Sequence, residues 1–546
     1  MQKRNAMEST QVVIIGGGIT GAGILWDLSL RGISAVLFEK QDLANGATGR
    51  CHGLLHSGCR YVIKDSDAAK ECAIESKIIK KIAPNCVQNT GGFFIQCSQD
   101  DPTFFTKWEE SCKNIDIVSE RLSVDEVLAM EPNLTTNILG AFTCSDSYVD
   151  VFQLVKSNIG SAVMRGANFR SYCEVTAINS DGGRVRYVDY INNLTGESGA
   201  IACDIVVNAS GGWAQKIAAM VGVNVSMRCD KGSLIVFNHS LVNHVINRCR
   251  MPGDADIIVP AGPVCILGTS SIVVPNPENL TVDFNEIQHL LNIGIELVPK
   301  ITDARILRIF SGARPLYTPK NITTAAGREI SRGFALLDHK VHDQISGFIS
   351  IVGGKLTTYR LMAEMTSDLI ASKLGNDRPC MTKEVPLRVA TDERVMKRAC
   401  QLLPIHIATT IERRLGSDLA HVVNTIETKP ETAEVICECE QITLAEIDVI
   451  LKNKTSIPVN TISDIGRRTR LGFGPCQGTF CGYKAMLAGY KNKRWTAKQA
   501  SEEFERFLNE RRKGQYVVSQ GKQIEQLFLS NYLFGMAYNF YNQKKG

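Results

Sequence analysis

Short apolar runs and glycine-rich turns alternate at the start of the chain. Residues 12–15 read VVII, a β-branched run typical of a buried strand. A glycine-rich stretch follows (GGGITGAG), and then come ILWDLSLRG and ISAVLFEK. This order predicts a strand, a glycine turn, a helix that stops near residues 31–32, and a second strand that ends at Glu39.

Further apolar runs predict strands and helices in the body of the chain. DIVV at 204–207 and FISIV at 348–352 are typical of strands. The second of these leads into LMAEMTSDLIASKLG at 361–375, whose apolar positions predict an amphipathic helix. Segments near 90–150 and 215–340 are strand-rich, with runs such as VINRCR, ADIIVP and VCILGTS. We therefore expect an α/β fold, α+β overall.

The last third of the chain is predicted to be mainly helical. Residues 393–416 have a helical pattern that breaks at Pro404. Residues 424–434 (NTIETKPETAE) are polar, and we expect them to be extended and to mark a domain boundary. Beyond this boundary, ITLAEIDVILKNKT predicts a helix with Thr443 as its cap and Glu446 three residues on, and GYKAMLAGYK predicts another.

Composition limits the class of protein. The chain has 546 residues, enough for roughly three to four domains of ~150 residues. Its net charge of +5, without a block of like charges, does not suggest nucleic-acid binding. Most of the 18 cysteines are scattered singly, which indicates buried thiols in a reducing compartment. No signal peptide precedes the glycines and no apolar window is long enough to span a bilayer, so we expect a cytoplasmic protein.

The first glycine turn has the spacing of a dinucleotide-binding motif. Gly16, Gly18 and Gly21 fit G-x-G-x-x-G between two predicted strands. Such glycines allow a tight turn, a close backbone approach to a pyrophosphate, and close packing of helix on strand. Glu39 stands about 20 residues on, where a carboxylate can accept hydrogen bonds from ribose hydroxyls. The motif alone does not separate FAD from NAD.

Several motifs in order carry a family resemblance. They are KQDLANGATGRCHGLLHSGCRY (40–61), NASGGWA (208–214), KGSLIVF (231–237), LGTSS (267–271), FSGARPL (310–316) and GGKLTTYR (353–360). Together they resemble the FAD-dependent glycerol-3-phosphate dehydrogenases, flavoproteins with a D-amino-acid-oxidase-like fold, over residues 10–385. The resemblance implies an FAD-binding part (about 10–90, 150–215 and 340–385) interrupted by a substrate β-sheet part (about 90–150 and 215–340).

The resemblance also implies which residues bind FAD. GATG and NASGGWA are small-residue loops whose backbone can approach the cofactor, and GGKLTTYR is expected at a helix N-terminus that faces the flavin ring. The implied cofactor-binding residues are Gly16, Gly18, Gly21, Glu39, Lys40, Ala47, Thr48, Gly49, Ala209, Gly211, Gly353, Gly354, Lys355, Leu356 and Thr357.

A glycerol phosphate substrate needs cations for its phosphate. By resemblance, the substrate-binding residues are Arg60, Tyr61, Thr269, Arg314, Arg332 and Lys355. Several of these cations have no obvious carboxylate partner in the sequence, which favours a phosphate over an amino acid. We expect His56 to take the hydroxyl proton with Arg314 assisting; the alternative is a histidine that only hydrogen-bonds the flavin. Where some family members have a histidine after KGS, this chain has Leu234.

Four late cysteines form two close pairs. Cys437 and Cys439 are a C-x-C pair, and Cys476 and Cys481 follow with four residues between them. The pattern resembles the small helical [2Fe-2S] domains of the bacterioferritin-associated-ferredoxin (BFD) type, although those usually space the second pair by two residues. The alternatives are a zinc site with four thiolates or, less expected in a reducing compartment, a disulfide. A cluster is favoured because it would remove electrons from the flavin one at a time.

The flavin motifs and the cysteines together resemble the large subunits of anaerobic glycerol-3-phosphate dehydrogenases. The implied partners are the quinone pool, a membrane-anchoring iron–sulfur subunit, and a second soluble subunit, with the chain peripheral on the inner face of the membrane. We expect a helical linker at 386–434, a BFD-like domain at 435–487 and a helical tail at 488–546. The apolar segment within the tail, about 527–541, is expected to dock on the protein itself, or else on a partner or the membrane.

The expected reaction is oxidation of sn-glycerol 3-phosphate to dihydroxyacetone phosphate, with hydride passing from carbon 2 to flavin N5 and electrons continuing to a quinone. Three alternatives stay open. The chain could be a flavin oxidase that passes electrons to oxygen, an amino-acid or amine dehydrogenase of the same fold, or a non-catalytic electron-transfer or assembly subunit.

Overall fold

A parallel sheet forms around the N-terminal glycine turn. The computed structural model describes residues 7–278, 280–318, 333–387, 391–452 and 457–540. The predicted strand–turn–helix–strand unit is present as β1 (Glu8–Ile15), α1 (Ile19–Leu30) and β2 (Ala35–Phe38).

Strand β1 pairs in parallel with β2 on one side and with β12 (Ser198–Asn208) on the other, and β12 pairs in parallel with β20 (Phe348–Gly353). The sheet is completed by β9 (Asn168–Arg170), β10 (Cys173–Asp181), β11 (Arg184–Asn192) and β19 (Phe334–Asp338). Strand β9 also pairs in parallel with β2, so the carboxyl ends of five parallel strands meet at one edge, which is where ligands bind in such sheets.

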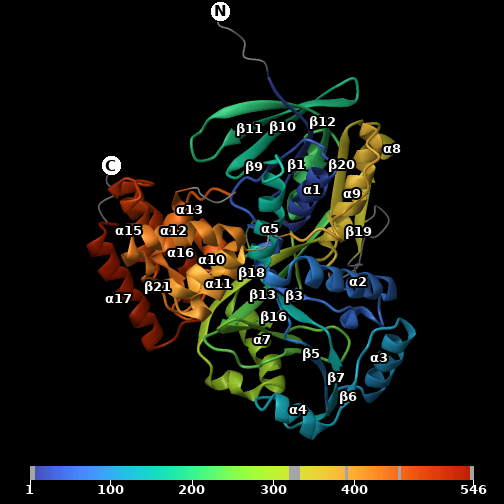
Figure 1. Ribbon diagram of the computed structural model, residues 1–546. Helices are drawn as coiled ribbons and strands as arrows, with labels where there is room; N and C mark the ends of the chain where they lie inside the picture. Colours follow the sequence, from blue (N-terminus) through green and yellow to red (C-terminus); the bar gives the residue numbers. More distant parts are fainter. Residues whose placement is uncertain (1–6, 279, 319–332, 388–390, 453–456, 541–546) are drawn as a thin grey trace, which may run out of the picture.

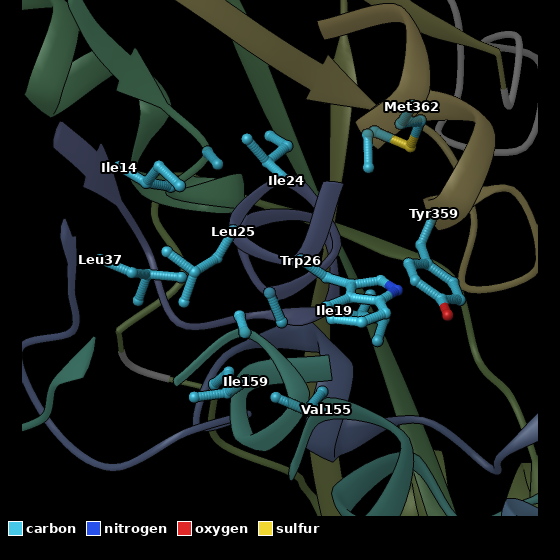
Figure 2. Packing of buried hydrophobic residues seen from close by; sticks show 14 of the residues in the cluster. Ile14, Ile19, Ile24, Leu25, Trp26, Leu37, Val155, Ile159, Tyr359 and Met362 are labelled. Atoms are coloured by element: carbon cyan, nitrogen blue, oxygen red, sulfur yellow. The ribbon is translucent and has the colours of Figure 1, made fainter. Parts of the chain in front are cut away.

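Three helices pack on one face of this sheet. They are α1, α5 (Val151–Val163) and α9 (Tyr359–Leu374). Figure 2 shows their apolar side chains meeting around α1, with Leu25 of α1 and Ile159 of α5 among them. All of the side chains labelled there are buried. Each buried side chain of this size stabilises the fold by about 1.5–3 kcal/mol, so this layer fixes the position of the first glycine turn.

A second sheet combines the two strand-rich segments, as the sequence predicts. Strands from about 92–144 and 227–317 pair with each other in the order β17-β13-β16-β15-β14-β5-β7-β6, with β18 beside β13. Their bounds are β5 (Gly92–Cys97), β6 (Arg121–Leu122), β7 (Ile138–Cys144), β13 (Met227–Phe237), β14 (Val245–Arg248), β15 (Ile257–Ala261), β16 (Val264–Gly268), β17 (Ile272–Val274) and β18 (Ile306–Tyr317). Helices α2 (Ser66–Ile82), α3 (Pro102–Asn114), α4 (Val124–Met130) and α7 (Phe284–Leu297) complete this part.

The C-terminal helices share one hydrophobic core. That core runs from Ala399 to Phe540 and so joins the expected linker, cysteine segment and tail. Figure 1 shows these orange and red helices gathered on one side of the molecule. They are α10 (Glu393–Leu402), α11 (Ile405–Leu415), α12 (Leu419–Thr428), α13 (Leu444–Leu451), α14 (Ile462–Thr469), α15 (Gly482–Lys491), α16 (Ala497–Tyr516) and α17 (Lys522–Ala537).

Local signals for these helices are mostly confirmed. The helical pattern breaks at Pro404, between α10 and α11, and the capping box of Thr443 and Glu446 begins α13. The prediction that residues 424–434 are extended is wrong over most of the segment, because 424–428 belong to α12 and Pro430–Ala433 form a 3-10 turn. Val423 and Ile426 of that helix are buried in the shared core, and this packing outweighs the polar composition of the segment.

The expected docking of the tail on the protein is only partly correct. Phe534 of α17 and Phe540 beyond it pack against Phe504 of α16. Most of the apolar side chains of α17 nevertheless face outward, with exposed fractions of 56–63%; they are Phe528, Leu529, Tyr532, Leu533 and Met536. Figure 1 shows α17 along the outer edge of the molecule. No helix among the described residues is both long and apolar enough to cross a membrane.

Buried ion pairs connect the C-terminal helices to the part of the chain that carries the two large sheets. We call that part the flavin-type body and the contact region between the two the joint. Arg468 of α14 donates to both carboxylate oxygens of Asp42, at 2.7 and 2.8 Å, and both side chains are buried. Nearby, Arg470 pairs with Asp150 at 3.1 Å. A Cβ at Gly514 would stand 2.2 Å from the carbonyl oxygen of Ile309, so glycine is required where α16 crosses β18.

Candidate functional site

A cavity lies at the carboxyl ends of the parallel strands. Its empty volume is about 1260 Å³. We call it the strand-end cavity. The predicted cofactor residues that line it are Gly16, Gly18, Glu39, Lys40, Ala47, Thr48, Ala209, Gly211 and Gly353. Strands β1, β2, β12 and β20 all end there, which explains how segments more than 300 residues apart contribute to one site.

The glycine turn leaves an open helix N-terminus at this cavity. Gly16 has φ +118°, and a Cβ there would stand 2.6 Å from the carbonyl oxygen of Ala209. Helix α1 then begins at Ile19 with Gly18 as N-cap and no side-chain cap. Thr48 Oγ1 accepts from the Ile19 N–H at 3.2 Å. A helix start whose N-cap residue has no side chain is suited to a phosphate, because its amides and dipole favour an anion.

Glu39 is fixed at the end of β2 by backbone hydrogen bonds. Its carboxylate accepts from the N–H groups of Gly17 at 2.8 Å and Gln41 at 3.0 Å. Burial raises the pKa of Glu39, and these two hydrogen bonds oppose the rise. Lys40 follows with its ammonium 4.4 Å from the centre of the Trp213 ring. The carboxylate is thus held at the strand end, at the wall of the cavity.

The other predicted cofactor residues lie around the cavity. Gly21 lies beneath it, where a Cβ would meet the Gly16 carbonyl oxygen at 2.0 Å. Gly49 lines two neighbouring cavities. Residues 354–357 form a turn before α9, whose N-cap is Thr358, so they precede the helix. The sequence places Gly353, Gly354, Lys355 and Leu356 ahead of a helix; Gly353 ends β20 and the other three lead into α9.

Some cavity residues were not predicted. They include Asn45, Arg50, Cys173, Val175, Ser210, Gly212, Trp213 and Met362. Gly212 and Trp213 belong to NASGGWA and could have been found from that motif. Cys173 and Val175 enter through the pairing of distant strands, and no local signal marks them.

A second group of polar residues brings together cations from three segments. Arg314 of β18 donates to Asp230 at 2.8 Å, to the Ser270 carbonyl at 3.2 Å and to Thr269 Oγ1. Arg60 donates to Asp256 at 3.3 Å. Both aspartates are fully buried. The prediction that these arginines lack carboxylate partners is therefore wrong: Asp230 of β13 pairs with Arg314, and Asp256, just before β15, pairs with Arg60.

Lys355 contrasts with the two arginines. Its buried ammonium has no hydrogen-bond partner in the described part of the chain and lies 5.0 Å from the centre of the Tyr61 ring. The backbone N–H of His56 donates to Thr357 Oγ1 at 3.2 Å, and the His56 and Tyr61 rings meet edge to face at 5.4 Å. The turn at 354–358 thus rests on the segment 56–61. Arg332 lies outside the described residues.

The structure argues against His52, one of the two histidines in this group, as the base. Burial, together with the charges of His56, Arg314 and Arg60, lowers the pKa of His52 to about 3. His52 therefore stays neutral at ordinary pH and is too weak a base to take a proton from an alcohol. This leaves His56 as the histidine for such a role in this group.

The four late cysteines come together as two loops. Cys437 ends a short strand (Val435–Cys437), Cys439 follows it, and Cys481 is the N-cap of α15. The thiols of Cys481 and Cys439 hydrogen-bond to Cys476 and lower its pKa to about 5, although burial opposes the shift. Cys437 also contacts Cys481. The donor set fits a thiolate-bound metal or cluster, but no group of three or more ligands in the described residues already has metal-binding geometry.

The strand order, the glycine turn and the strand-end cavity define a class of dinucleotide-binding α/β oxidoreductases. Comparison with known families agrees: residues 11–360 match the model "FAD dependent oxidoreductase" (DAO). The chain is 38% identical over 535 residues to the A subunit of the anaerobic glycerol-3-phosphate dehydrogenase of Escherichia coli K12, covering 97% of each chain. It is 39% identical to the A1 subunit of the enzyme of the same name from Haloferax volcanii, covering 97% of this chain and 91% of that one.

A solved structure supports the fold over almost the whole length. The FAD complex of glycerol-3-phosphate dehydrogenase from Bacillus halodurans superposes with a TM-score of 0.70 at 22% identity, covering 94% of this chain and 96% of that one. Glycine oxidase from Geobacillus kaustophilus has a TM-score of 0.56 and covers 67% of this chain. The chain belongs to the family of FAD-dependent oxidoreductases and, within it, to the group of anaerobic glycerol-3-phosphate dehydrogenase A subunits.

Proposed function

We propose that this chain oxidises sn-glycerol 3-phosphate to dihydroxyacetone phosphate with bound FAD. The observation that carries the proposal is the buried Lys355 ammonium, which has no hydrogen-bond partner in the described part of the chain. A buried cation without a partner is costly, and an anionic substrate would relieve that cost. The names of the relatives at 37–39% identity point to the same substrate.

The strand-end cavity is proposed to hold FAD. Gly18 and Thr48, at the start of α1, would face the pyrophosphate, and Glu39 the ribose hydroxyls. Gly211 and Gly353 would line the cofactor where β12 and β20 end. When bound, FAD accepts a hydride at N5. Everything else in the reaction has to come from the chain's own side chains.

The cations are proposed to bind different parts of the substrate. Lys355 binds the phosphate most directly, because Arg60 and Arg314 already have buried aspartate partners. The guanidinium group of Arg314 then stabilises the negative charge that develops on the alkoxide oxygen. His56 takes the proton of the hydroxyl on carbon 2. The low pKa of His52 argues against it as the acceptor. Tyr61, Thr269 and Arg332 complete the proposed contacts.

We further propose that Cys437, Cys439, Cys476 and Cys481 ligate a [2Fe-2S] cluster. Cys481 contacts Cys437 and Cys476, and Cys476 contacts Cys439, so the four thiols gather from two loops as the ligand set that such clusters use. Electrons would leave through this cluster to a quinone, by way of a second soluble subunit plus a membrane-anchoring iron–sulfur subunit. The exposed apolar side chains of α17 offer a surface for a partner or for the inner face of the membrane.

An anaerobic titration with glycerol 3-phosphate, followed by absorbance and EPR, tests both the proposed oxidation of the substrate and the proposed cluster. We expect the flavin band to bleach and a cluster signal to appear as electrons arrive. In C476S the flavin should still bleach but the cluster signal should be lost, whereas C400S, which changes an exposed single cysteine, should behave as wild type.

Each alternative gives a different outcome. An unbleached flavin in well-loaded protein would refute the dehydrogenase and favour an electron-transfer or assembly role. Bleaching without any EPR signal, with zinc found by metal analysis, would refute only the cluster. Stoichiometric peroxide in air would favour an oxidase.

A further inference from the structure

Three arginines without acidic partners meet at the joint between the flavin-type body and the C-terminal helices. Arg50 ends a short 3-10 turn (Ala47–Arg50), Arg308 lies on β18, and Arg511 lies on α16. All three line one cavity with an empty volume of about 1710 Å³, which we call the arginine cavity. Within the described residues, none of the three makes an ion pair or a hydrogen bond through its guanidinium.

Neighbouring arginines at the same joint are paired. Arg467 contacts Asp42 at 3.2 Å, and Arg470 contacts Glu440 at 2.9 Å. Arg467 lines the arginine cavity as well, so the lack of an ion-pair partner is a property of Arg50, Arg308 and Arg511 and not of every cation in the cavity. All three arginines are half-buried, and removing part of a charge from water without an ion-pair partner costs free energy.

Aromatic rings hold two of these guanidinium groups in place without neutralising them. Arg511 lies 4.7 Å from the centre of the Phe473 ring and 5.4 Å from that of Phe507. Arg308 lies 5.2 Å from the centre of the Phe310 ring. Cation–π contacts of this kind orient an arginine and leave its N–H donors available. The cavity therefore presents fixed, unused donors.

The charges of the three arginines repel one another. Burial and the charge of a neighbouring arginine (Arg50 for Arg308, Arg308 for Arg511) together lower the pKa of Arg308 to about 10 and that of Arg511 to about 9. Glu510 is the carboxylate that acts on Arg50 and Arg308, and it is already engaged by Lys513. Cys481 and Cys476 act on Arg511 in the same sense as Glu510 acts on the other two. The lining of the cavity nevertheless has five cations (Arg50, Arg308, Arg467, Arg511 and Lys513) and two acids (Glu278 and Glu510), so an excess of positive charge remains.

We propose that the arginine cavity binds a small oxyanion, either inorganic phosphate or the phosphate group of an ester. Planar forks from a turn, a strand and a helix suit a tetrahedral dianion, which accepts several hydrogen bonds at once. The site is separate from the helix start that suits a cofactor pyrophosphate, although Arg50 lines both cavities. A bound oxyanion would join α16 to β18 and so tighten the joint.

Thermal unfolding of the FAD-loaded protein tests the proposal. The midpoint Tm is measured in potassium phosphate and in potassium chloride at equal ionic strength, with flavin content checked in each sample. Wild type should gain about 2 °C or more in phosphate. R308Q and R511Q should lose at least half of that gain, and in chloride their Tm should equal or exceed that of wild type because the repulsion is reduced. R506Q removes an exposed arginine of the same helix and should keep the full gain.

The same variants identify the source of the anion. A gain that depends on Arg308 with glycerol 3-phosphate as well as with inorganic phosphate assigns the cavity to phosphate esters, and a gain with inorganic phosphate alone assigns it to the free ion. Phosphate bound near Lys355 contributes equally to every variant and cancels in the comparison. If R308Q and R511Q keep the full phosphate gain, or if wild type has none, the proposal is wrong. Isothermal titration of wild type and R308Q with phosphate should show one site fewer in the variant.

Discussion

Replacing Asp42 by asparagine should loosen the joint that connects the cysteine-bearing helices to the body. Asp42 is 1% exposed and Arg468 is 2% exposed, and two hydrogen bonds join them. The variant keeps the shape of the side chain but leaves the arginine charge buried and unpaired. Removing one partner of a buried pair costs about 3–5 kcal/mol. At 1.36 kcal/mol for each factor of ten, this is about 150- to 5000-fold in a local opening equilibrium.

Hydrogen exchange measured by mass spectrometry gives that equilibrium directly. Peptides that cover α14 should exchange about 150- to 5000-fold faster in D42N, while peptides from α1 should change little. E384Q makes the same chemical change in an exposed pair with Lys81 and should stay within about fivefold of wild type. The double variant D42L/R468M, which removes both charges, should recover most of the protection.

The reasoning would be refuted if D42N speeded exchange in α14 by less than tenfold. It would also fail if D42L/R468M were as unprotected as D42N, because the loss would then come from packing and not from an unpaired charge. The pH dependence gives a further check. Burial raises the pKa of Asp42, but the charges of Arg468 and Arg467 outweigh it and hold the pKa below its usual 3.8. The protection is therefore complete above about pH 4 and lost only as pH falls through the lowered pKa.

Three further predictions follow from single sites. G16A should be purified with little FAD, because its Cβ would stand 2.6 Å from a backbone oxygen, whereas G222A, where the Cβ has open space, should keep a full flavin-to-protein ratio by absorbance. K355M should raise KM for glycerol 3-phosphate roughly 10- to 150-fold without lowering Tm, as expected for a lost charged hydrogen bond; a lower Tm with unchanged KM would contradict this. The pKa of His52 is about 3 when folded and 6.5 when unfolded, so the unfolded state binds its proton first and acid favours unfolding. Over that range wild type should lose about 1.4 kcal/mol per pH unit more than H52Q, seen as a steeper fall of Tm, and identical profiles would exclude the shift.

Local patterns predicted much of the fold because their signals act over short distances. The β-branched run at 12–15, the glycine turn and the strand that ends at Glu39 each depend on neighbours in sequence. The break at Pro404 and the Thr443–Glu446 capping box depend on residues within one helical turn of each other. The polar composition of residues 424–434 gave a wrong prediction of an extended segment, because the helix that begins before it forms by burying Val423 in a core supplied by distant residues.

The surroundings of the candidate site could not be predicted in the same way. Lys355 and Arg314 look alike in a sequence, since both are cations in glycine-flanked motifs. Only the second sheet gives Asp230 to Arg314, and no described residue gives a hydrogen-bond acceptor to Lys355. The difference is one of tertiary contacts, and it decides which cation has unused hydrogen-bond donors for a substrate.

The sequence by itself determined the family, the dinucleotide turn and the positions of the four paired cysteines, because each is carried by residue types at fixed short spacing. The tertiary structure alone decided which charges are paired and which are left without partners. It joined Asp42 to Arg468 and collected Arg50, Arg308 and Arg511 in one cavity. The physical reason is that ion pairing depends on distance in space and on burial, and strand pairing across hundreds of residues sets both.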